Sequence, residues 1–155
     1  MRDDAGSPAR SDAQPPRLAY LVNHYPAVSH SFIRREILAI EAAGEAIERF
    51  SIRPAGPVSD PADRAEIGRT TVILDQGAPR LLAATLALAF SRPRAFLGAL
   101  RVTLSMAGGA PSRIVRHLAY LVEACWLTRR LESHGITHLH AHFGTNPAAV
   151  ARLVR

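Results

Sequence analysis

The sequence predicts an α/β fold built on a doubly wound parallel sheet. Short apolar runs such as residues 18–22 are typical of strands that are buried on both faces of a parallel sheet. Segments with apolar residues at helical spacing separate these runs, and this alternation favours βαβ units. The chain has 155 residues, of which 48% are hydrophobic, so it is long enough to bury one core.

The first part of the chain predicts a tail, a strand and a helix. Residues 1–16 contain three Pro and three Asp, and we expect them to form a disordered tail. A strand over residues 18–22 runs into loop residues 23–26. A helix then follows, with Ser29 as its N-cap and Gly44 as its stop. Its apolar residues recur at four and three positions: Ile33, Ile37 and Ile40.

Two further strands and a connecting loop follow. The stretch from Ile47 to Ile52 alternates as a second strand, and residues 70–74 predict a third. Residues 53–68 contain three Pro and two Gly, and we expect a loop there.

The second half of the chain predicts mainly helices. Residues 81–90 and 95–106 have helical patterns separated by the breaker Arg92-Pro93-Arg94. A long amphipathic helix is expected from Ser112 to Gly135, followed by a fourth strand over residues 138–143. Gly144-Thr145 would then turn the chain, with Asn146 as N-cap and Pro147 as the first residue of a last helix.

Right-handed βαβ units predict the strand order 3-2-1-4. In such a Rossmann-like sheet the first and fourth strands are neighbours, and ligands bind beyond their carboxyl ends. We therefore expect the loops over residues 23–31 and 142–146 to meet in one crevice. This convergence is the main inference from the sequence.

The last helix runs to Arg155 without a cap or a returning strand, and the fourth strand keeps an unpaired edge. We therefore expect residues 17–155 to be a partial domain of a longer protein.

The composition and charge of the chain limit the classes of binding partner and the cellular compartment that we expect. The net charge is +6 and all 19 basic residues are Arg, which permits anionic partners but does not choose among them. The Arg residues lack the interleaved aromatic residues of a nucleic-acid platform, so we expect no nucleic-acid partner. One cysteine excludes an intramolecular disulfide and a Cys-based zinc site. The N-terminus lacks the apolar core of a signal peptide, and no run of about 18–20 apolar residues exists. We expect a cytoplasmic protein.

The apolar stretch 81–106 carries dispersed basic residues and allows two interpretations. It could lie on an anionic membrane surface, which would make the protein peripheral to the inner membrane. Alternatively, it forms a pair of helices packed on the sheet, and this interpretation is favoured. The basic residues are Arg80, Arg92, Arg94 and Arg101.

The loop before the first helix collects polar groups at a helix N-terminus. Free backbone N–H groups there suit an anionic or hydroxyl-rich ligand, although ordinary capping with Phe32 and Ile33 as anchors explains the pattern equally well. The GxGxxG fingerprint is absent, which counts against an NAD-dependent enzyme.

Three histidines alternate along the fourth strand. His138, His140 and His142 would point to one face about 6–7 Å apart. An H-x-H pair can chelate zinc, with His24 or His30 as the further ligand, and this makes a metal-dependent hydrolase an alternative. The favoured interpretation is no metal site: His138 is solvated, His140 is a satisfied interior residue and His142 reaches the crevice.

Two stretches of the chain carry a family resemblance. The first is Arg17-Leu18-Ala19-Tyr20-Leu21-Val22, with Tyr25-Pro26 and Ser29-His30-Ser31-Phe32-Ile33-Arg34-Arg35-Glu36-Ile37. The second is residues 136–151, which contain His138-Leu139-His140-Ala141-His142-Phe143-Gly144. In this order they resemble the N-terminal domain of family 4-type glycosyltransferases of the GT-B fold, most closely the exopolysaccharide and colanic-acid-type enzymes. His30 stands where these enzymes often have an acidic residue, and Gly44-Glu45-Ala46 where they commonly have Gly-His-x-Val.

The resemblance implies transfer of a sugar from a nucleotide-sugar donor to a glycan or lipid-linked acceptor, with no other cofactor. The domain that grips the nucleotide and the strand that carries a cleft histidine in this family lie beyond residue 155. The resemblance therefore implies no catalytic residue within the chain and no activity of the chain alone. A non-catalytic chain that pairs through the edge of the fourth strand is a further alternative. We expect the crevice to bind the acceptor through the following residues: Asn23, Tyr25, Ser29, His30, Ser31, His142, Gly144, Thr145 and Asn146.

Overall fold

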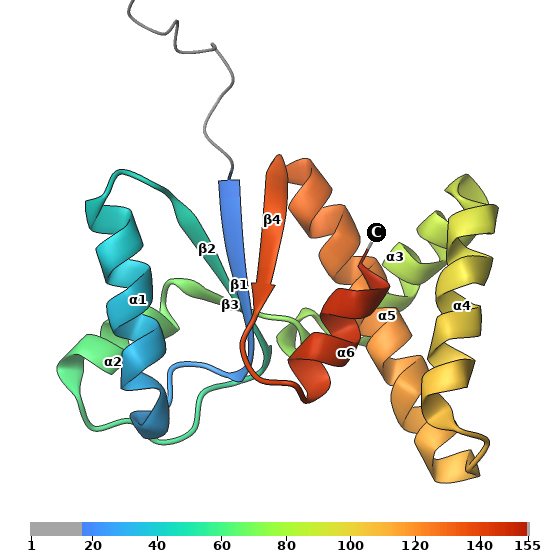
Figure 1. The fold of residues 1–155 in the computed structure, drawn as a ribbon, viewed down its shortest axis with the longest axis horizontal. Helices are drawn as coiled ribbons and strands as arrows, with labels where there is room; N and C mark the ends of the chain where they lie inside the picture. The colour runs from blue at the N-terminus through green and yellow to red at the C-terminus, as the bar shows by residue number, and fades with distance from the viewer. Residues whose placement is uncertain (1–16, 155) are drawn as a thin grey trace, which may run out of the picture.

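The computed structural model describes residues 17–154, and they form an α/β fold around one parallel sheet (Figure 1). The four strands stand in the order β3-β2-β1-β4, and each neighbouring pair is parallel. The predicted fold class and strand order are both confirmed. The predicted tail, residues 1–16, lies outside the described residues. The strands are β1 (Arg17–His24), β2 (Ile47–Arg53), β3 (Thr70–Val72) and β4 (Ile136–Ala141).

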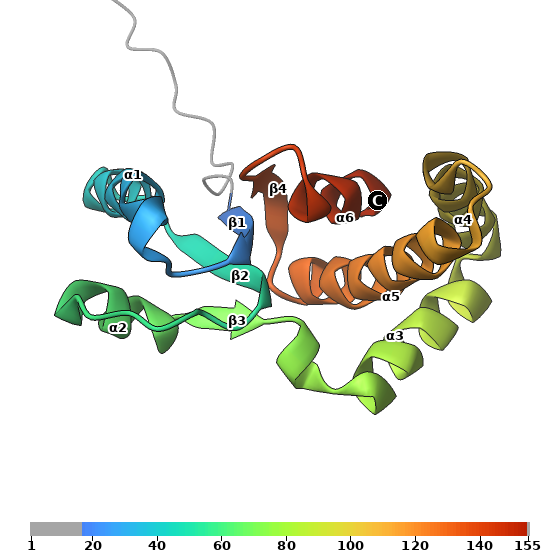
Figure 2. The same ribbon diagram turned by 90° about the horizontal axis from the view of Figure 1, so that it is seen from below.

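Helices cover both faces of the sheet. Figure 2 shows α1 (Ser31–Ala42) and α2 (Pro61–Ile67) on one side of the strands, with α5 (Pro111–Ser133) and α6 (Asn146–Leu153) on the other. The helices α3 (Ala78–Ser91) and α4 (Pro93–Ala107) form an outer layer on α5. Two short 3-10 helices, η1 (Val28–His30) and η2 (Leu74–Gln76), complete the elements.

Alternation along β1 divides the core between the two faces. Ala19 and Leu21 belong to the larger apolar cluster, which includes residues of α5 and α6. Tyr20 and Val22 belong to a smaller cluster with Ile33 of α1. Because successive residues of a strand point to opposite faces, the position of a polar residue in β1 decides on which face of the sheet its side chain lies.

Three local expectations at helix starts are wrong. Residues 61–67 form α2 instead of a loop, because the Asp60 side chain accepts a hydrogen bond from the Ala62 N–H and Pro61 suits the first turn. Ser29 lies inside η1 and does not cap α1, which begins at Ser31 after His30. Asn146 is the first residue of α6, and its side chain does not cap the helix.

The third and fourth strands end earlier than expected. β3 stops at Val72, because the chain from Leu74 onward turns into η2. β4 begins at Ile136 and stops at Ala141, two residues before the expected end. Phe143 has a φ of 70°, which no strand residue adopts, and this ends the extended chain.

The pair α3 and α4 packs chiefly against α5, where the sequence favoured packing on the sheet. The longer α5 and the short α6 already occupy that face of the sheet. The outer pair therefore leaves large apolar side chains exposed, among them Leu82, Leu86, Phe90 and Leu97. Among residues 17–154, no helix combines the length and the apolar character needed to cross a membrane.

A buried guanidinium joins β2 to α1 and α2. Arg49 Nε donates to Glu66 Oε2 at 2.8 Å, and its two Nη atoms donate to the two carboxylate oxygens of Glu41 at 2.8 Å each. Tyr25 Oη also donates to Glu66 Oε2, at 2.9 Å. Only 4% of the Arg49 and Glu66 side chains is exposed. Because water cannot replace these partners, removing one of them leaves an uncompensated buried charge.

We expect Arg49→Ala to lower the free energy of unfolding by about 3–5 kcal/mol, because Glu66 would lose its main buried cation. Urea denaturation followed by circular dichroism measures the change. Arg35→Ala is the matched control, since Arg35 is exposed on α1 and its loss should cost no more than about 0.5 kcal/mol. Equal losses in the two variants would contradict the role of the buried network.

Candidate functional site

The two loops that the sequence predicts to converge do meet at the carboxyl ends of β1 and β4. The His142 N–H donates to Leu21 O at 3.0 Å, which carries the β1–β4 pairing one residue past β4. Asn146 Nδ2 lies 3.5 Å from Asn23 Oδ1. The predicted convergence is therefore confirmed. We call the following seven residues the carboxyl-edge cluster: Asn23, His30, Phe32, Tyr120, His142, Phe143 and Asn146.

Amide and hydroxyl groups form the part of this cluster nearest α5 and α6. Asn146 bridges two elements, because its Oδ1 accepts from Tyr120 Oη at 2.6 Å while its Nδ2 faces Asn23. Tyr120 comes from α5 and is not among the site residues expected from the sequence. Its helical spacing marks it as an inward-facing residue, but nothing local to it points to the distant Asn146. These groups can donate to and accept from a hydroxyl-rich ligand.

Aromatic rings form the part of the cluster nearest α1. The His30 and Phe143 rings have centroids 5.0 Å apart, and Phe32 packs edge-on to both His142 and Phe143. Phe32 and Phe143 are 45% and 46% exposed, which is unusual for such large apolar side chains. Phe143 also adopts a left-handed backbone conformation, and strained non-glycine residues of this kind gather at ligand sites.

The other expected site residues are placed unevenly. Tyr25 is buried on the α1 side of the sheet and donates to Glu66, so it does not reach the carboxyl-edge cluster. This expectation is wrong because Tyr25 turns back into the smaller core cluster. Ser29, Gly144 and Thr145 are exposed near the cluster, and Ser31 is half-buried at the start of α1.

The histidines of β4 lie on the α1 face, as the alternation predicts. His138 is exposed, as expected. His140 is also exposed, which contradicts its interpretation as an interior residue: β4 is an edge strand, and α1 lies beside it without covering it. Burial lowers the pKa of His142, with the neighbouring His140 as a second cause. Its imidazole is therefore neutral at physiological pH.

One group of side chains has the composition of a metal site. The ligand atoms of Glu36, His140 and His142 all lie within 4.8 Å of one another. The expected suppliers of a further ligand are engaged elsewhere: His24 Nδ1 contacts Pro54 O at 3.0 Å, and His30 Nδ1 contacts His24 O at 3.1 Å. Glu36 of α1, an exposed residue, is the third member of the group instead.

A second titratable group lies on the face of the sheet opposite the histidines. Glu123 is one helical turn from Tyr120 and is buried, and its Oε2 has no hydrogen-bond partner among residues 17–154. Burial raises the pKa of Glu123 to about 7, and Arg53 lowers it in part. Glu123 is not among the residues expected from the sequence, although residues 118–127 are otherwise apolar and this run is a signal of burial.

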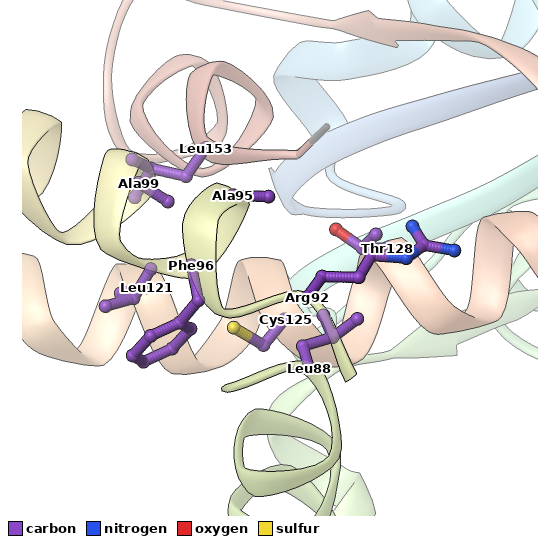
Figure 3. A pocket seen from close by; sticks show the side chains of 9 residues that line it. All are labelled: Leu88, Arg92, Ala95, Phe96, Ala99, Leu121, Cys125, Thr128 and Leu153. Carbon is purple, nitrogen blue, oxygen red and sulfur yellow. The ribbon is translucent and has the colours of Figure 1, made fainter. Parts of the chain in front are cut away.

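An apolar cavity of about 30 Å³ lies between α3, α4, α5 and α6, away from the carboxyl-edge cluster (Figure 3). Phe96, Cys125 and Leu153 are among its lining residues. Its volume has room for one or two water molecules but not for a substrate. Burial raises the pKa of the Cys125 thiol, so this cysteine is not activated as a nucleophile.

Comparisons of the chain with protein-family models, with curated proteins and with solved structures find no match. The candidate site therefore depends on the geometry of the residues themselves.

We expect Glu123 to contribute a loss of stability as the pH rises from 5 to 8. Its pKa of about 7 in the folded state exceeds the ordinary 4.5, so between these values the folded state holds a proton that the unfolded state releases. Glu123→Gln removes this loss, and its stability relative to the unchanged protein should grow by about 1–3 kcal/mol from pH 5 to pH 8. Urea denaturation at both pH values measures the difference.

Glu132→Gln is the control for this measurement, because Glu132 is exposed on the same helix. Its stability should follow that of the unchanged protein within about 0.5 kcal/mol at both pH values. If Glu123→Gln also follows the unchanged protein, Glu123 does not hold a proton in the folded state.

Proposed function

We propose that the chain is the acceptor-binding part of a family 4-type glycosyltransferase that acts in exopolysaccharide biosynthesis. The reaction would transfer a sugar from a nucleotide-sugar donor to a glycan or lipid-linked acceptor. The observation that carries the proposal is the meeting of Asn23 with Asn146, since it brings together the two stretches that resemble this family. In a parallel sheet this edge is the usual place for ligands.

The chemistry of the carboxyl-edge cluster suits a carbohydrate. The 3.5 Å contact between the two asparagine side chains is long, so a sugar hydroxyl can replace it at little cost. Phe32 and Phe143 offer exposed aromatic faces on which the apolar face of a sugar ring can stack. A mainly apolar surface with a few directed polar groups is the usual composition of a small-molecule site.

In this proposal, the chain binds the acceptor and a separate domain binds the nucleotide-sugar donor. The residues at the carboxyl edge would hold the acceptor, while the nucleotide diphosphate would bind to the second domain that the family resemblance implies. The chain alone would therefore bind an acceptor without transferring a sugar.

A location on the cytoplasmic surface of a membrane belongs to the same proposal. The outer helices α3 and α4 carry exposed Leu86, Phe90 and Leu97 beside basic residues. Residues 76–122 contain six Arg and no Asp or Glu. An apolar and cationic surface of this kind suits anionic lipid head groups.

The edge of β4 supports a second candidate function, the binding of another chain without catalysis. Within residues 17–154, β4 pairs only with β1, so its outer backbone groups are free to pair with an added strand. Association that depends on concentration, and that a peptide supplying the missing strand abolishes, would support this candidate.

We expect Asn146→Ala to lower kcat/KM for sugar transfer about 10- to 100-fold when the chain is joined to a donor-binding domain of the same family. The variant removes the amide that meets both Tyr120 and Asn23, which is worth about 1–3 kcal/mol. Donor-dependent transfer to a lipid-linked saccharide measures the effect.

Thr137→Ala is the matched control for Asn146→Ala. Thr137 is exposed near the start of β4, at the opposite edge of the sheet from Asn146, and its loss should leave transfer unchanged. If transfer survives both Asn146→Ala and Phe143→Ala at full rate, the assignment of the acceptor site is overturned.

A further inference from the structure

Two imidazoles and a carboxylate meet on the α1 face of β4. His140 and His142 are alternate residues of one extended chain, so both rings project to the same face, with centroids 4.6 Å apart. Glu36 reaches them from α1, and its Oε2 lies 3.9 Å from His142 Nε2. The three ligand atoms lie within 4.8 Å of one another. Strand pairing and helix packing therefore bring together potential metal ligands from residues that are about 100 positions apart in sequence.

Tyr20 holds this group in position. Its hydroxyl donates to Glu36 Oε1 at 2.6 Å, which leaves Oε2 directed at His142. Its ring lies 5.0 Å from both His140 and His142. Hydrogen bonds from neighbouring residues orient the carboxylates that bind metals in proteins in the same way. One buried tyrosine of β1 thus contacts all three potential ligands.

His142 supplies an independent sign of a missing ligand. Its side chain is only 10% exposed, and its Nε2 has no hydrogen-bond partner among residues 17–154. A buried polar nitrogen without a partner is unfavourable and uncommon in folded proteins. The same nitrogen faces Glu36, so an ion between the two would supply the missing contact.

We propose that Glu36, His140 and His142 bind one divalent transition-metal ion of the zinc class. Two neutral imidazoles and one carboxylate form a common three-residue set for zinc, and the fourth position stays open to water or a ligand. Tetrahedral zinc places its ligand atoms about 3.3 Å apart, given bonds of about 2.0–2.1 Å. His140 and Glu36 are exposed, so their side chains can close the remaining distance without disturbing the core.

The proposal is tested by titrating the metal-free chain, without an affinity tag, with zinc chloride against a chromophoric chelator. We expect one equivalent to bind with a dissociation constant of about 1 μM or below. Cobalt chloride should produce the intense visible absorption of a tetrahedral site. His140→Ala and Glu36→Gln should each weaken zinc binding at least tenfold, since each removes one ligand. Tyr20→Phe should weaken binding about tenfold, because Glu36 then loses its orienting hydrogen bond.

His138→Ala is the matched control, because His138 is exposed on the same face of the same strand but lies outside the three-residue group. It should bind zinc like the unchanged chain. Circular dichroism verifies that each variant is folded, which is expected for changes at the exposed His140 and Glu36. Less than one equivalent bound at 100 μM zinc overturns the proposal, and so does binding that survives His140→Ala or falls equally in His138→Ala. The measurement needs no substrate, so its outcome is independent of sugar transfer.

Discussion

The parallel pairing of β1 with β4 is the constraint on which both candidate sites depend. The pairing sets Leu18 opposite His138 and Tyr20 opposite His140. Because side chains alternate along a strand, a slip of β4 by one residue would turn the histidines toward α6 and away from Glu36. The two strands are joined by a crossover of more than 100 residues, so the pairing is a property of the whole domain rather than of any local segment.

The ion-pair network around Arg49 complements this pairing. It joins α1 to β2 through Glu41 and joins α2 to both through Glu66. Its buried charges are satisfied only in one arrangement of these elements, which favours a single position of α1 on the sheet. Since Phe32 and Glu36 belong to α1, the network also determines where these two side chains stand beside β4.

The alternation of side chains along the strands places two groups of polar residues on opposite faces of the sheet. Asn23, Tyr120 and Asn146 lie on the α5 and α6 side, where amides and a hydroxyl suit a neutral sugar. Tyr20, Glu36 and the two imidazoles lie on the α1 side, where the donors suit a metal ion. The carboxyl edge of one strand pair can therefore bind two ligands that share His142, while Asn146 belongs to the sugar site alone and His140 to the metal site alone.

The sequence by itself determined the strands, their order and the meeting of the loops after β1 and β4, because the periodicity of apolar residues and the handedness of βαβ units are local or general rules. Only the tertiary structure decided which side chains face one another. Tyr120 and Glu36 gained their roles from partners far away in sequence, and Tyr25 lost its expected role by turning into the core. His140 became exposed because no helix covers the edge strand on that face. Packing against distant elements sets the burial and the direction of a polar side chain, and the pattern around that residue in the sequence does not encode them.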